Sequence, residues 1–208
     1  PRIEGMSVIL ESLQKESGMF FKKFMVVLGI LLANNLQAGG HLPAESAMLK
    51  KAEAFIDAFY SFESEKLAPL LEFADTSADS ILYYQAWARG GNYKVMNRGE
   101  CKFSYQGTVK CPITVEDDLV LALKTDFLVT DTFEITFVDS EIGKIETSSN
   151  DQPIYYDARD WVKANRPEVM QTVCNDMWKK VENAGDCVRA MHEGYKAYYD
   201  SIEKSGGV

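Results

Sequence analysis

FLVTDTFEITFVDSEIGKIET, residues 127–147, is the stretch that decides the fold of this chain. Polar residues stand at even positions such as Thr132, Glu134 and Thr136, and this period-two alternation is typical of a half-buried strand. Residues 140–143 have the composition of a turn, and residues 144–146 resume the alternation. We therefore predict a long β-hairpin with one buried face. The apolar positions of that face are Phe127, Val129, Phe133, Ile135 and Phe137.

One residue breaks the pattern, because Asp131 falls on the apolar face. Two interpretations are open. Either a bulge or turn shifts the phase of the strand at this point, or the carboxylate points into a cavity.

Length and composition restrict the class of protein. A chain of 208 residues suits one domain, or one domain with an appendage. With 46% hydrophobic and 12% aromatic residues it has enough material for a core. The formal net charge of −9 argues against nucleic acid as a partner, because binding to phosphates requires a basic face. Binding to an anionic membrane surface is disfavoured for the same reason.

An export signal is predicted near the amino terminus. Residues 19–23 resemble a charged leading region, Phe24–Ala33 is an apolar run, and Leu36–Ala38 resembles a cleavage site. The run is shorter than the ~20 apolar residues that span a bilayer, so cleavage is favoured over a retained membrane anchor. Residues 1–18 precede this signal and are left out of the fold prediction. The expected location is secreted or periplasmic, with no membrane contact after cleavage.

Export to an oxidising compartment favours disulfides for the four cysteines, Cys101, Cys111, Cys174 and Cys187. Sequence order favours the pairs 101–111 and 174–187. The second bridge requires the preceding helix to end early. A zinc site is the rival interpretation, but no C-x-x-C occurs and only two histidines exist, so we expect neither a metal nor a cofactor.

The rest of the chain is predicted to be α+β. Helices are expected at about residues 44–62, 65–73 and 80–88, and antiparallel strands follow from residue 93. Pro112 should place its strand at an edge or a bulge, and Leu119–Leu123 is predicted as a further strand. Helices are expected again at residues 157–164, after Pro167 and at residues 186–203. The tyrosines at 195, 198 and 199 on the last helix are interpreted as a docking face.

This order of elements resembles the NTF2-like superfamily, also described as the cystatin-like cone and as SnoaL-like or ketosteroid-isomerase-like. The resemblance covers about residues 44–148. It depends on amino-terminal helices followed by a curved antiparallel sheet, and on the closing hairpin with Phe133–Phe137 and Gly143–Ile145. With residues 1–38 set apart as the upstream residues and export signal, it implies a domain at 39–150 and a helical extension at 151–208.

The resemblance also implies a pocket between the concave sheet face and the helices. The residues expected to line it are Phe55, Phe59, Tyr83, Tyr84, Trp87, Phe127, Phe133 and Ile135. Isomerase chemistry there would require a carboxylate base and a neutral acid. The candidates are Asp75 or Asp79 near the helix start, Tyr83 or Tyr84 beside it, and Asp126 or Asp131 on the sheet. Asp79 is explained equally well as a helix cap, and dehydratase-like chemistry is weakened because residues 44–191 contain no histidine.

Three functions stay open, because a fold does not decide a function. The first is binding of a small apolar or amphipathic ligand. The second is an isomerase or lyase that uses a pocket carboxylate and a tyrosine, which requires a buried carboxylate of raised pKa near a tyrosine hydroxyl. The third is an interaction module that forms a homodimer through the outer face of the sheet, without catalysis.

Overall fold

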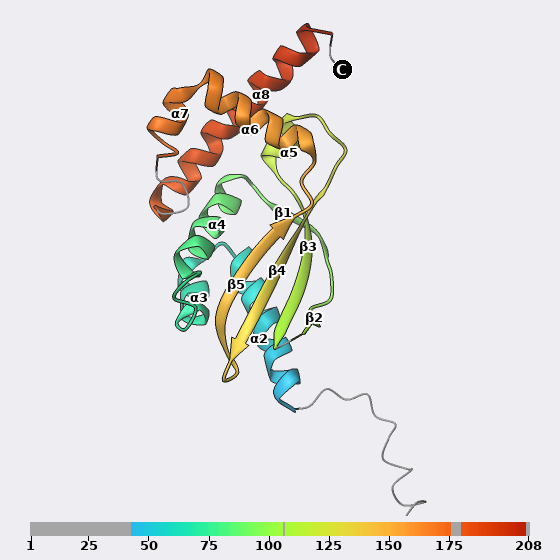
Figure 1. Ribbon diagram of the computed structural model, residues 1–208, viewed down its shortest axis with the longest axis vertical. Helices are drawn as coiled ribbons and strands as arrows, with labels where there is room; N and C mark the ends of the chain where they lie inside the picture. The colour runs from blue at the N-terminus through green and yellow to red at the C-terminus, as the bar shows by residue number, and fades with distance from the viewer. Residues whose placement is uncertain (1–42, 106, 176–179, 207–208) are drawn as a thin grey trace, which may run out of the picture. The chain divides into compact units, whose positions relative to one another are not determined.

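A five-stranded antiparallel sheet lies at the centre of the fold (Figure 1). The computed structural model describes residues 43–105, 107–175 and 180–206. The strands run in the order β1-β3-β4-β5, with the short β2 also paired to β3. Their bounds are β1 Lys94–Arg98, β2 Lys102–Phe103, β3 Thr108–Glu116, β4 Val129–Val138 and β5 Glu141–Ser149. With the helices described below, this confirms the α+β class.

Helices precede and follow the sheet in the sequence. Before β1 come α2 Pro43–Tyr60, α3 Ser64–Leu67, the 3-10 helix η2 Ala68–Leu71 and α4 Ala78–Gly90. After β5 come α6 Pro153–Asn165, α7 Pro167–Gln171, the 3-10 helix η3 Val181–Asn183 and α8 Ala184–Lys204. In the part of the chain that the structure describes, no helix has both the length and the apolar character to cross a bilayer. The predicted export signal lies outside the described residues.

The hairpin of β4 and β5 forms where the alternation predicted it. Its turn consists of Asp139 and Ser140, both with positive φ (50° and 66°), as in the type I′ turns that suit the twist of a hairpin. The turn is therefore tighter than the predicted residues 140–143. The register of the hairpin shifts between Thr136 and Phe137, and Gly143 is the extra residue of β5 at this bulge. A Cβ on Gly143 would lie only 2.8 Å from the Val138 side chain.

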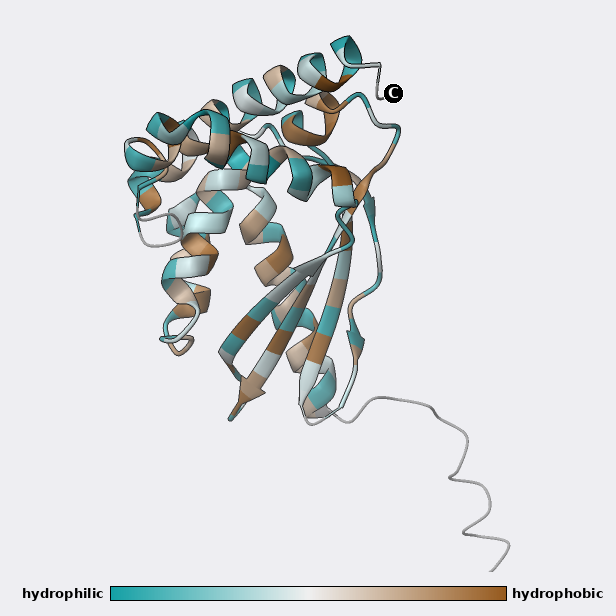
Figure 2. Ribbon diagram, turned by 45° about the horizontal axis from the view of Figure 1, so that its top comes forward, coloured by the Kyte–Doolittle hydropathy of each residue, from teal (hydrophilic) through white to brown (hydrophobic). Residues whose placement is uncertain are grey.

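The inner face of the sheet packs against α2, which lies across it (Figure 1). Buried and less buried side chains alternate along β4, and the strands carry bands of alternating hydropathy (Figure 2). Phe133 is fully buried, with its ring centre 5.6 Å from that of Phe55 and 4.9 Å from that of Phe59. Gln85 of α4 donates to the backbone carbonyls of Ala58 and Phe59 and so ties α4 to the end of α2.

The placement of Pro112 at an edge or a bulge is wrong, because β3 is an internal strand with β4 on one side and β1 and β2 on the other. The carbonyl of Pro112 accepts from the backbone N–H of Gly99, so the polar groups of this residue point toward the break between β1 and β2. The missing N–H is tolerated there because Gly99, the residue opposite, lies beyond the end of β1, so only one hydrogen bond of the ladder is lost at the break.

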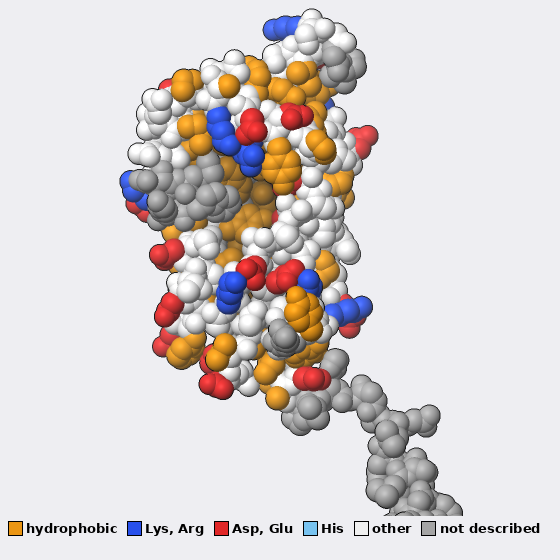
Figure 3. Space-filling view, in the orientation of Figure 1, with side chains coloured by type: hydrophobic (Ala, Val, Ile, Leu, Met, Phe, Trp, Pro, Cys, Tyr) orange, Lys and Arg blue, Asp and Glu red, His pale blue; other side chains and the backbone are white. Residues whose placement is uncertain are grey.

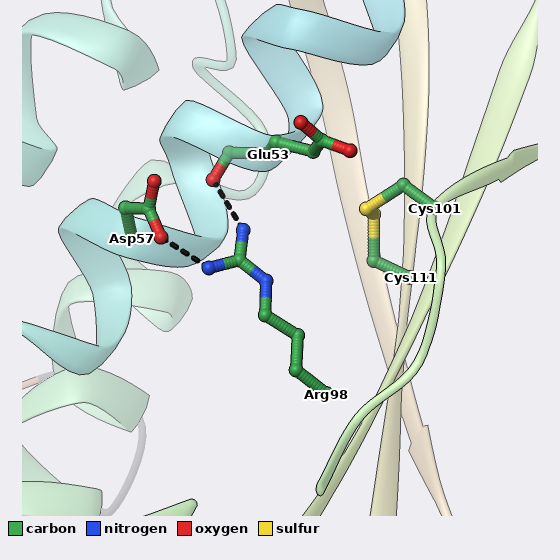
Figure 4. Close-up of a disulfide and its surroundings, with 5 residues drawn as sticks. All are labelled: Glu53, Asp57, Arg98, Cys101 and Cys111. Carbon is green, nitrogen blue, oxygen red and sulfur yellow. Dashed lines mark hydrogen bonds and ion pairs between the residues drawn. A yellow bond between two sulfur atoms is a disulfide. The ribbon is translucent and has the colours of Figure 1, made fainter.

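The break between β1 and β2 is held by a disulfide and by an ion pair (Figure 4). Cys101 is bonded to Cys111 of β3. Arg98, at the end of β1, pairs with the Asp57 carboxylate and donates to the backbone carbonyl of Glu53 at 3.0 Å, both on α2. The edge of the sheet is thereby fastened to the helix that covers its inner face.

The predicted strand Leu119–Leu123 is wrong, because the structure has the short helix α5, Asp118–Ala122, in its place. Asp117 caps this helix, accepting from the backbone N–H groups of Leu119 at 2.8 Å and Val120 at 3.0 Å. A short apolar run does not distinguish strand from helix by its period, so the aspartate just before it was the more informative signal.

The carboxy-terminal helices share a second buried cluster with α4 and α5. α6 and α8 approach each other closely at Gly194, where a Cβ would lie 2.4 Å from the Val162 side chain. Cys174 is bonded to Cys187 in the first turn of α8. Because α7 ends at Gln171, before Cys174, the geometric requirement for this bridge is met.

Candidate functional site

A pocket of about 480 Å³ opens between the sheet and the helices α4, α6 and α8. The space-filling view shows it as a hollow with hydrophobic side chains inside (Figure 3). The lining combines aromatic rings, hydroxyl groups and charges. It consists of Tyr84, Trp87, Tyr93, Val129, Asp131, Thr147, Ser148, Ser149, Asp151, Tyr155, Tyr156, Arg159, Met191 and Tyr195.

Asp131 is the buried charge of this pocket, with 3% of its surface exposed. It stands opposite Ile113 on one side and Ser149 on the other, and the alternation of buried residues continues through it without a register shift. The strand is therefore not re-phased at Asp131. Of the two interpretations of Asp131, the structure supports the second, in which the carboxylate faces a cavity.

Two tyrosine hydroxyls hold the Asp131 carboxylate. The hydroxyl of Tyr60, the last residue of α2, lies 3.4 Å from Oδ2, and the hydroxyl of Tyr84 on α4 also hydrogen-bonds to the carboxylate. Burial raises the pKa of Asp131 to about 7, although both hydrogen bonds act in the opposite direction. The charges of Asp151 and Asp117 raise this pKa further. A carboxyl group that titrates near neutral pH is suited to exchange protons or to bind a cation.

Tyrosines from four segments form the aromatic wall. The ring of Tyr84 meets that of Tyr93 edge to face at 6.3 Å, and the ring of Tyr155 meets that of Tyr195 in the same way at 5.2 Å. Burial raises the pKa of all four hydroxyls, so they stay protonated at neutral pH. They act there as neutral hydrogen-bond donors and acceptors.

The rim of the pocket carries the exposed polar groups. Asp151 follows β5 and accepts hydrogen bonds from the hydroxyls of Ser149 at 2.5 Å and Tyr156 at 3.2 Å. The guanidinium of Arg159 on α6 lies 5.0 Å from the centre of the Tyr156 ring and pairs with Asp160. The loop after β5 and the start of α6 are therefore joined across the mouth.

Three residues that the sequence analysis selected meet at this pocket, namely Tyr84, Trp87 and Asp131. Most of the other predicted lining residues lie in a core instead, which corrects their expected role. α2 lies close against the sheet, so its rings fill that part of the fold. Fully buried between α2 and the sheet are Phe55 and Phe59 of α2 and Phe133 and Ile135 of β4; Phe127 is half-buried at the same core, and Tyr83 packs with the carboxy-terminal helices.

The other candidate carboxylates lie outside this pocket. Asp75, Asp79 and Asp126 are exposed and do not belong to its lining. Asp79 lies in the first turn of α4, where a negative charge stabilises the helix end.

Sequence reasoning missed Tyr93, Tyr155 and Tyr195 as site residues. Tyr195 was assigned to a docking face, but only 1% of its surface is exposed, because α8 turns this side toward α6 and the pocket. The apolar spacing of the last helix contained a signal, since Tyr195 lies one turn beyond the buried Met191.

A larger depression of about 750 Å³ lies between α4 and the start of α8. Its charged side chains include Arg89, Arg189, Glu182 and Glu193, all exposed and of opposing sign. Exposed charges that offset each other give little reason for a specific ligand, so the sheet pocket is the stronger candidate. Among the described residues, no three His, Cys, Asp or Glu side chains are grouped so that they could hold a metal ion.

Comparison of the chain with models of protein families, with curated proteins and with solved structures gave no match.

Proposed function

We propose that this protein binds a small molecule of mixed apolar and polar character in the pocket between the sheet and the helices α4, α6 and α8. The observation that carries the proposal is Asp131, a nearly buried carboxylate that faces a pocket lined by aromatic rings. Ligand sites are typically hollows of about 300–1,000 Å³, and this pocket of about 480 Å³ lies in that range, with aromatic rings, hydroxyl groups and charges in its lining.

We further propose that the α+β fold is an NTF2-like cone with a helical extension, and that the protein is exported. The first part is supported by α2, α3 and α4 preceding an antiparallel sheet that α2 covers on one face. The second is supported by the two disulfides, which are typical of proteins in oxidising compartments.

A bulky residue at the pocket mouth tests the proposed binding. Thr147 pairs with Phe133 and so shares the inner face of the sheet, whereas Thr132 of β4 lies on the outer face. Thr147→Phe should abolish ligand binding, and Thr132→Phe provides the same change in size on the opposite face. A screen of amphipathic small molecules by thermal shift measures both variants. If a ligand binds Thr147→Phe as tightly as the unaltered protein, this pocket is not its site.

An isomerase or lyase is the second candidate function. The buried carboxylate of raised pKa that such chemistry requires is present in Asp131, and the hydroxyls of Tyr60 and Tyr84 lie beside it. In this reaction the ionised Asp131 would take a proton from the carbon next to a carbonyl, and a tyrosine hydroxyl would stabilise the enolate oxygen.

Proton exchange tests the second candidate directly. Enolisable ketones that bind in the pocket should exchange their α-hydrogens in deuterated water, as followed by NMR. Asp131→Asn should stop this exchange while the ketones still bind. Exchange at the uncatalysed rate with saturating protein would count against catalysis and leave the binding proposal intact.

The third alternative, a homodimer formed through the outer face of the sheet, receives less support. That face carries the hydroxyl pairs Thr108–Thr136 and Thr114–Thr130 and the ion pair Lys110–Glu134. Such a face offers little apolar area for a stable interface to bury.

A further inference from the structure

Two carboxylates line the pocket, Asp131 in its wall and Asp151 at its rim, and Asp117 lies close enough to act on the same groups. Burial first, and then the negative charges of all three, raise the pKa of Tyr93. Asp117 and Asp151 also raise the pKa of Asp131 itself. A hollow whose wall and rim carry carboxylates attracts a positive group.

Asp131 has no cationic partner within the described part of the chain. The groups that donate to it are the neutral hydroxyls of Tyr60 and Tyr84. One basic side chain, Arg159, lines the pocket, and its guanidinium is paired with Asp160 and placed over the Tyr156 ring. A buried carboxylate without a cation is costly to ionise, so a cation that arrives with a ligand would offset that cost.

Aromatic rings surround the same space. Rings that line a pocket attract a cation over their faces, and tryptophan and tyrosine do so more strongly than phenylalanine. The six aromatic lining residues are Tyr84, Trp87, Tyr93, Tyr155, Tyr156 and Tyr195.

We propose that the ligand of this pocket is a protonated amine on an apolar body, with its ammonium group directed toward Asp131 and its body against the aromatic wall. This inference rests on the proposed binding function and specifies the chemical class of the ligand. The ammonium N–H groups donate to the Asp131 carboxylate, which a quaternary ammonium cannot do. An anionic group placed beside Asp131 would meet the like charges of Asp131 and Asp151, while the one basic lining residue, Arg159, is already paired with Asp160.

Binding of the amine depends on pH through Asp131. The groups that act on its carboxyl are Tyr60 of α2, Tyr84 of α4, Asp117 before α5 and Asp151 after β5. An ammonium favours the ionised carboxylate and lowers the pKa of Asp131 from about 7. Amine affinity therefore increases as the pH rises through this range, while the affinity of a neutral ligand of the same shape does not.

The test compares 2-phenylethylamine with 2-phenylethanol, which has nearly the same shape but no charge, by isothermal titration calorimetry on the full chain. At pH 8 the Kd of the amine should be lower than that of the alcohol by a factor of at least about ten, as expected for a hydrogen bond to a buried charge. The advantage should shrink at pH 5 and vanish in Asp131→Asn. It should persist in Asp126→Asn, which removes an exposed carboxylate outside the pocket.

Binding of the alcohol to Asp131→Asn shows that the pocket of this variant is intact. Equal binding of amine and alcohol overturns the inference, as does an advantage of the amine that survives in Asp131→Asn. If Thr147→Phe weakens both probes equally, the binding function stands and only the preference for a cation fails. If neither probe binds at millimolar concentration, the inference fails for this class of amine, and the broader ligand screen decides the binding function separately.

Discussion

Replacing Asp131 by asparagine should make the folded protein more stable at alkaline pH and remove part of its pH dependence. Asparagine has nearly the same shape, and its carbonyl oxygen accepts hydrogen bonds from Tyr60 and Tyr84 as the carboxylate does. The variant therefore removes the ionisation of a side chain that is only 3% exposed while retaining its packing.

The magnitude follows from the two pKa values of this carboxyl group. Its pKa is about 7 in the folded protein, against an ordinary value of 3.8. Each unit of difference corresponds to about 1.4 kcal/mol, so the folded state loses up to about 4 kcal/mol when Asp131 ionises.

The sign follows from which state holds the proton. Below about pH 4 the carboxyl is protonated in both states, and its contribution to stability is fully present. Between about pH 4 and pH 7 the folded protein retains a proton that the unfolded chain has released, so stability falls as the pH rises. Above this window the folded protein bears the full free-energy cost of ionising the buried Asp131, and Asp131→Asn avoids that cost.

Urea unfolding followed by tryptophan fluorescence at several pH values from 4 to 8.5 (about one pH unit apart) measures this effect. The free energy of unfolding of Asp131→Asn, minus that of the unaltered protein, should grow by about 3–4 kcal/mol across the series. Asp117, whose pKa burial raises to about 6, titrates in both proteins, so only its coupling with Asp131 remains in the difference. Asp126→Asn is the control for an exposed carboxylate and should follow the unaltered protein. Parallel curves for Asp131→Asn and the unaltered protein would refute the reasoning, because they would mean that Asp131 ionises in the folded state as it does in water.

Three further predictions concern the packing of the fold, and chemical denaturation checks each of them. Phe133→Ala should cost about 3–5 kcal/mol because it empties a fully buried site, whereas Phe73→Ala, at a ring that is 58% exposed, should cost far less. Gly194→Ala should destabilise by about 1–3 kcal/mol because the new methyl group meets Val162, while Gly185→Ala, whose nearest neighbour lies at 3.4 Å, should be neutral or stabilising. Reducing the two disulfides, which join residues 10 and 13 apart, should cost about 3 kcal/mol each through the entropy of the unfolded chain, and an unchanged urea midpoint after complete reduction would contradict this.

The sequence by itself determined the hairpin, most of the long helices and the anomaly at Asp131. These features depend on local periodicity, since a strand with one buried face repeats every two residues and a helix repeats every 3.6. Asp131 is in phase with Val129 and Phe133, which left two interpretations open, and the unbroken register of β4 decided for the inward direction. The short apolar run at 119–123 was misassigned because periodicity says little over so few residues.

Only the tertiary structure decided which side chains surround Asp131. Tyr60, Tyr84, Asp151 and Tyr195 lie on four segments spread over much of the chain, and no local pattern specifies that they meet. Their meeting depends on how α2 fills one part of the inner sheet face and how α6 and α8 leave another part open. The sequence therefore placed a carboxylate on a buried face. The packing of distant helices formed the pocket, and burial there raised the pKa of Asp131.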